Sequence, residues 1–144
     1  MLLGSVRYDL GDYDGAIGYC RRALTVDLDR SDAYRTMGMA LREKGDRKAA
    51  LEQFNKALDI NSEDVETYRE AALTLSMDGD PDGAIAKLLK ALEIDPNNAS
   101  VRCDLGTVLL KRGDREQALE QFRKALKINP RCVCAAEALK GSSH

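Results

Sequence analysis

The chain has 144 residues, of which 44% are hydrophobic and 32% are charged, and its formal net charge is -2. This composition is that of a globular chain rather than a disordered one, and the near balance of 22 basic and 24 acidic residues disfavours nonspecific binding to nucleic acid. Apolar runs are only a few residues long, so no membrane span or secretory signal is visible, and we expect a cytoplasmic protein that binds no membrane.

A Gly-Asp pair recurs every 34 residues and gives the chain its organisation. The pairs begin at Gly11, Gly45, Gly79 and Gly113. An alanine follows each glycine by five residues, and an Ala-Leu pair begins seven residues after that alanine. Units of this length cannot bury an apolar face alone, so they stack on their neighbours into a solenoid. The period therefore indicates binding rather than catalysis.

Helical periodicity and helix-terminating residues predict a series of helices. Their expected ranges are roughly 1–10, 13–27, 32–44, 47–61, 65–78, 81–95, 99–112, 115–129 and 132–140. The glycine of each pair is expected to end one helix in the left-handed conformation, and the aspartate to cap the next. At Asp114, the spacing to Gln117 also predicts a capping box. Each unit is thus a helical hairpin.

The units resemble the tetratricopeptide repeat, a helix-turn-helix of this length with small and aromatic residues at fixed places. In the last complete unit these places hold Leu105, Gly106, Leu109, Ala118, Phe122, Ala125 and Pro130. Arg102 replaces the usual helix aromatic, and Ala72 the usual glycine of the preceding unit. The resemblance implies an all-α, right-handed α-solenoid of about four repeats, the first truncated, with a partial C-terminal helix.

We expect one domain over residues 1–141. Its expected parts are a truncated repeat at 1–30, repeats at 31–64, 65–98 and 99–132, and a partial capping helix at 133–141. Residues 142–144 are expected to be a tail left by a purification tag.

In proteins similar to this one, the first helix of each hairpin lines a concave groove. The resemblance implies that this groove binds a peptide. The predicted groove residues are Arg35, Thr36, Met39, Arg42, Arg69, Glu70, Leu73, Met77, Cys103, Asp104, Thr107 and Leu110. The apolar ones would form a floor for an amphipathic helix or extended peptide, and the charged ones would fix its direction. Alternatively, any of them packs against the facing helix or the next repeat.

Two known ligand modes of the family do not fit. The carboxylate clamp for chaperone C-terminal tails is built from basic residues and asparagines, but its positions in this chain include Glu70 and Asp104, which would repel the ligand. The asparagine ladder of sugar-transferase repeats is also missing, because its positions hold Thr36, Glu70 and Asp104. The partner is therefore expected to be a different protein or peptide.

Groups for catalysis or metal binding are scarce. His144 is the only histidine, and the sequence contains no phosphate-binding loop. Cys20 stands where later units have Phe54 or a similar core residue, while Cys132 and Cys134 lack the second ligand pair of a zinc site. We expect four unpaired, reduced thiols, no cofactor and no metal.

The expected function is that of a noncatalytic protein-protein interaction scaffold. One alternative is a self-associating module that assembles through its repeat ends, which Leu2, Leu3, Val6 and Leu10 suggest. Another is a regulatory arm of a larger enzyme.

Overall fold

The computed structural model describes residues 2–141, which form α-helices joined by short turns and contain no strand in that range. The helices are α1 Leu2–Asp9, α2 Tyr13–Val26, α3 Ser31–Glu43, α4 Arg47–Ile60, α5 Val65–Met77, α6 Pro81–Ile94, α7 Ala99–Arg112, α8 Arg115–Ile128 and α9 Val133–Gly141. The predicted helices and the all-α fold are confirmed. The expected tail at 142–144 lies outside the described residues.

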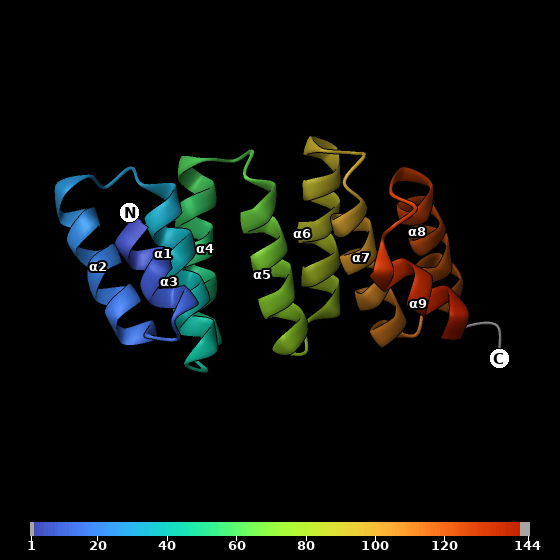
Figure 1. Ribbon diagram of the computed structural model, residues 1–144, viewed down its shortest axis with the longest axis horizontal. Helices are drawn as coiled ribbons and strands as arrows, with labels where there is room; N and C mark the ends of the chain where they lie inside the picture. The colour runs from blue at the N-terminus through green and yellow to red at the C-terminus, as the bar shows by residue number, and fades with distance from the viewer. Residues whose placement is uncertain (1, 142–144) are drawn as a thin grey trace.

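The hairpins follow one another along the long axis of the molecule, from α1 and α2 at one end to α9 at the other (Figure 1). The closest packing is within the pairs α3 and α4, α5 and α6, and α7 and α8. The second helix of each hairpin also contacts the first helix of the next, and α1, α3, α5 and α7 contact one another in sequence. The first helices therefore form a continuous row. Within residues 2–141, no helix is long and apolar enough to cross a membrane.

The Gly-Asp pairs set the turn inside each hairpin. Their glycines have φ between 78° and 100°, a left-handed conformation that costs glycine little. The side chains of Asp12, Asp46 and Asp80 each accept a hydrogen bond from a backbone N–H in the first turn of the following helix. Asp114 does not, because its carboxylate binds the Arg112 guanidinium instead. The prediction of a capping box at Asp114 is therefore wrong.

Large and small residues match in pairs where the two helices of a hairpin meet. Phe54 and Phe122 are almost completely buried, and a Cβ built on Gly38 or Gly106 would lie 2.7 or 2.6 Å from the respective ring. In the hairpin between them, alanine replaces the glycine and Leu88 replaces the aromatic residue. The phenylalanine ring opposite therefore requires a residue without a side chain at positions 38 and 106.

Ion pairs join neighbouring hairpins near the turns, and their polarity alternates. Lys44 binds Asp14 of the preceding hairpin, and Arg112 Nη1 lies 2.7 Å from Oδ1 of Asp82. At the interface between these two, the acidic partner is on the later hairpin, where Asp78 Oδ1 lies 3.9 Å from Arg47 Nη1. The middle interface thus has its charges reversed relative to the interfaces on either side.

Candidate functional site

The predicted groove residues lie in the row of first helices. Four come from α3, four from α5 and four from α7. Because α3 contacts α5 and α5 contacts α7, the three helices offer a shared surface. The structure does not bring all twelve side chains to that surface, and their burial separates them into groups.

A pocket of about 170 Å³ lies between α5 and α7 and contains five of the predicted residues. These are Arg69, Glu70, Leu73, Asp104 and Thr107, and the other lining residues are Ala72, Ser76, Leu88, Val108 and Lys111. Apolar side chains from three helices thus meet charged and hydroxyl groups. Such a mixture of an apolar lining and a few polar groups is typical of a ligand site.

Apolar side chains lie exposed on both helices of the pocket. Leu73 is 48% exposed, Met77 45% and Leu110 41%, although each lies on a helix whose opposite face is buried. Met39 differs, because it is half-buried and packs against the cluster around Phe54. The expected apolar floor is therefore concentrated on α5 and α7.

The arginines of the candidate site bind acidic residues of the following first helix. Arg42 Nη1 lies 2.5 Å from Oε2 of Glu70, and Arg69 Nε lies 2.6 Å from Oδ2 of Asp104. Burial acts most strongly on Arg42 and lowers its pKa, but the hydrogen bond and charge of Glu70 outweigh it, so that the pKa of Arg42 lies above its ordinary value. Burial also lowers the pKa of Arg69, but the hydrogen bond and charge of Asp104 outweigh it, so that the pKa of Arg69 lies above its ordinary value. Both guanidiniums stay charged, and each is already paired with an acidic side chain of this protein.

Several of the predicted groove residues are buried or half-buried between the helices. Thr36 and Arg42 are each 7% exposed and Cys103 is 3% exposed, so their side chains offer little surface to a ligand. Arg35 is half-buried and lies 3.2 Å from the carboxylate of Asp64, the residue that caps α5. Lys111, which the repeat register also assigns to the groove face of α7, lines the pocket as well. It takes part in none of the ion pairs found among residues 2–141.

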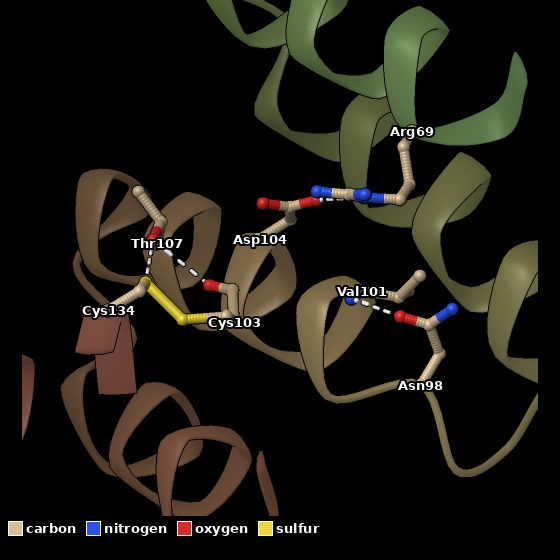
Figure 2. Close-up of a disulfide and its surroundings, with 7 residues drawn as sticks. All are labelled: Arg69, Asn98, Val101, Cys103, Asp104, Thr107 and Cys134. Carbon is tan, nitrogen blue, oxygen red and sulfur yellow. Dashed lines mark hydrogen bonds and ion pairs between the residues drawn. A yellow bond between two sulfur atoms is a disulfide. The ribbon is translucent and has the colours of Figure 1, made fainter. Parts of the chain in front are cut away.

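The expectation that the four cysteines are unpaired is wrong for two of them. Cys103 on α7 and Cys134 on α9 form a disulfide, with their Cα atoms 6.3 Å apart (Figure 2). The two cysteines are 31 residues apart, three fewer than the 34-residue period. Each therefore lies on the side of its helix that faces the other cysteine. Cys20 and Cys132 are free, and Cys20 is fully buried, as expected.

A second cavity, of about 280 Å³, lies beside the disulfide. Its lining includes Cys103, Cys132, Cys134, Ser100, Asn129 and Val133, together with Arg69 and Asp104. Since Arg69 and Asp104 line both cavities, the ion pair between them separates the pocket of α5 and α7 from the disulfide. Figure 2 shows this pair on one side of α7 and the disulfide on another. In the part of the chain that the structure describes, no group of three or more His, Cys, Asp or Glu side chains could hold a metal ion.

Comparisons with known proteins agree with the repeat geometry. Family models described as tetratricopeptide repeat (TPR) match residues 1–63, 35–99 and 75–141. The comparison with curated proteins gave no significant match.

Solved structures of similar shape are numerous. YrrB, described as a TPR protein with an unusual peptide-binding site, is 27% identical, with a TM-score of 0.83 over 95% of this chain and 71% of YrrB. PilF of Pseudomonas aeruginosa is 25% identical, with a TM-score of 0.87 over 99% of this chain and 67% of its own. MamA is 23% identical, with a TM-score of 0.83 over 99% of this chain and 86% of its own, which shows a shared fold.

Proposed function

This chain belongs to the tetratricopeptide repeat family, whose models together match residues 1–141, and on that premise we propose that it is a noncatalytic scaffold for a partner protein. The ligand is a peptide or helix of the partner, and it binds along α3, α5 and α7. YrrB, which has a peptide-binding site on the same fold, supports this proposal.

The pocket between α5 and α7 is the observation that carries the proposal. It places Leu73, nearly half exposed, beside the buried apolar residues Leu88 and Val108, with the hydroxyl of Thr107 at its edge. An apolar side chain of a peptide would bury its surface against these groups, while main-chain groups of the peptide would reach the hydroxyls.

The charges define which peptide fits. Arg42 and Arg69 are held by Glu70 and Asp104, whereas Lys111 is available at the pocket. A peptide with an acidic residue next to a leucine- or methionine-sized side chain would pair with Lys111 and fill the pocket. Since a short flexible ligand loses entropy when it is ordered, we expect a dissociation constant on the order of micromolar, or about -8 kcal/mol.

A peptide selected from a random library against the whole chain would test this proposal. Leu73→Glu and Met77→Glu should each weaken its binding by about tenfold or more, because each places a charge on the apolar floor. Leu89→Glu is the matched control, since Leu89 is also 48% exposed but lies on α6, outside the row of first helices that carries Leu73 and Met77. Fluorescence anisotropy measures the affinities, and circular dichroism checks that the variants fold. If Leu73→Glu and Met77→Glu bind as tightly as Leu89→Glu, the ligand does not occupy this groove.

Self-association is the second candidate. Leu3, Val6 and Leu10 on and just after α1 are 60%, 48% and 76% exposed, and a second copy could cover them. Analytical ultracentrifugation of the wild type and of Leu10→Glu would decide. A wild type that stays monomeric at high concentration would exclude this candidate.

A further inference from the structure

We propose that Cys103, Cys132 and Cys134 form a thiol–disulfide exchange site that holds α9 against the end of the groove and releases it on reduction. The site reacts with thiols and dithiols. The proposal does not depend on whether a peptide binds between α5 and α7, because it concerns the covalent attachment of α9.

The disulfide is a main attachment of α9. This helix has nine residues, of which Ala135 alone is buried, and Val133 at its start is 65% exposed. Its remaining apolar contacts come from half-buried residues, Ala138 and Leu139, packed against the core of the last hairpin. A helix of this length is not stable by itself in water. Without the bond to Cys103, α9 would keep these contacts but lose its covalent attachment to α7.

The three cysteines differ in access in a way that favours exchange. Cys103 is 3% exposed, whereas Cys134 belongs to the exposed residues and Cys132 is half-buried. All three line the same cavity, which gives a thiol a route to the bond. An incoming thiolate therefore meets the sulfur of Cys134 first. Cys134 is the second residue of α9, and the partial positive charge at the helix N-terminus stabilises the thiolate that Cys134 becomes once it is released.

The reaction balances as two successive displacements. One thiolate of a dithiol attacks Sγ of Cys134, the bond to Sγ of Cys103 breaks, and Cys103 leaves as a thiolate that takes a proton from water. The second thiolate of the dithiol attacks the mixed disulfide and releases Cys134 as a thiolate, which is also protonated. The dithiol is oxidised to its disulfide, and the protein gains two electrons and two protons. The thiolate of Cys132 can also attack one sulfur of this bond without an external reductant. It forms a new disulfide with that sulfur, the bond between Cys103 and Cys134 breaks, and the other sulfur leaves as a thiolate that takes a proton from water.

The site is connected to the groove through α7. Thr107 lines the groove pocket, its hydroxyl donates to the Cys103 carbonyl at 3.0 Å, and it lies 3.9 Å from Sγ of Cys134 (Figure 2). Arg69 and Asp104 line both cavities. When Cys134 is released, the cavity beside the disulfide loses one wall and opens toward the Arg69–Asp104 pair. Reduction therefore lengthens the groove at its α9 end.

In a reducing compartment the thiol pool opens accessible disulfides, whereas in an oxidising one they persist. If the protein is cytoplasmic, as its sequence leads us to expect, the exchange site reports the local redox state. In an oxidising compartment the same bond keeps α9 closed.

Amide hydrogen exchange with mass spectrometry tests the proposal on the whole chain, air-oxidised and after treatment with dithiothreitol. Reduction should accelerate exchange in residues 133–141 by about tenfold or more and leave α2 and α4 unchanged. Cys103→Ser should give the same fast exchange without reductant, and Cys20→Ser, outside the site, should not. Circular dichroism of the reduced wild type checks that the rest of the chain stays folded.

Peptide mapping without reduction supplies the second measurement. It should find Cys103 linked to Cys134 in the oxidised protein and, with limiting dithiothreitol, a fraction of molecules with Cys132 linked to one of them. Free thiols at Cys103 and Cys134 after oxidation, or exchange in α9 that ignores reduction, would overturn the proposal. The absence of any linkage to Cys132 would remove that residue from the site.

Discussion

Replacing Gly38 with alanine should destabilise the protein, whereas the same change at Gly18 should stabilise it. Both glycines lie inside helices, Gly38 in α3 and Gly18 in α2. A Cβ on Gly38 would lie 2.7 Å from Cε1 and 2.9 Å from Cδ1 of Phe54, whereas a Cβ on Gly18 would have nothing within 4 Å. The two changes are chemically identical and differ only in what the new methyl group meets.

Two opposing effects set the magnitude. Alanine is more favourable than glycine inside a helix by about 1 kcal/mol, and this gain applies at both positions. At Gly38 the methyl group overpacks the core, which typically costs about 1–3 kcal/mol. Because the Phe54 ring is fully buried and protein interiors are closely packed, we expect a cost near the upper end of that range. The net effect should be a loss of about 1–2 kcal/mol for Gly38→Ala and a gain of about 0.5–1 kcal/mol for Gly18→Ala.

Urea unfolding followed by far-ultraviolet circular dichroism measures both values. A third variant, with Gly38→Ala and Phe54→Leu together, recreates the Ala72 and Leu88 pair of the following hairpin. It should recover part of the loss, with a coupling energy of about 1–2 kcal/mol in a double-mutant cycle. If Gly38→Ala stabilises as much as Gly18→Ala, the contact with Phe54 does not constrain this position and the steric explanation fails.

Three further predictions concern ionisable side chains. Arg42→Ala should lower the free energy of unfolding by about 2 kcal/mol, because it leaves Glu70 partly buried without its partner and close to Glu43; urea unfolding showing less than about 0.5 kcal/mol would contradict this. Burial raises the pKa of Cys20 from about 9 to about 11, so its thiolate favours the unfolded chain, and stability should fall as the pH rises through that window by more in the wild type than in Cys20→Ala. For the same reason a maleimide at pH 8 should label Cys132 and leave Cys20 unmodified in the folded protein, and equal labelling of both would show that Cys20 is not protected.

The fold was predictable because local signals repeat in register. Each Gly-Asp pair specifies a helix end and the next helix start within a few residues, and both effects depend on backbone conformation rather than on distant contacts. The exception at Asp114 shows the limit of such rules. Its carboxylate had a competing donor in Arg112, and the sequence does not reveal which interaction is the more favourable.

The candidate site was less predictable because its side chains reach into neighbouring repeats. Position in the repeat puts Leu73 and Thr107 on the same face of successive first helices, and in the structure both line the pocket between α5 and α7. It does not show that Arg42 is buried against Glu70, 28 residues away, or that Cys103 bonds to Cys134. Those contacts depend on the offset between successive first helices, which follows from the packing of whole hairpins.

The alternating polarity of the inter-hairpin ion pairs restricts how such a chain can change its length. Deleting the 34 residues of the third unit would bring Arg47 against Arg112, and deleting the second would bring Asp14 against Asp78. Deleting both would bring Asp14 to Arg112, which is again an attractive pair. Each exposed pair contributes less than about 1 kcal/mol, so the effect is a bias rather than a barrier. The bias favours gain or loss of hairpins two at a time over gain or loss of a single 34-residue repeat.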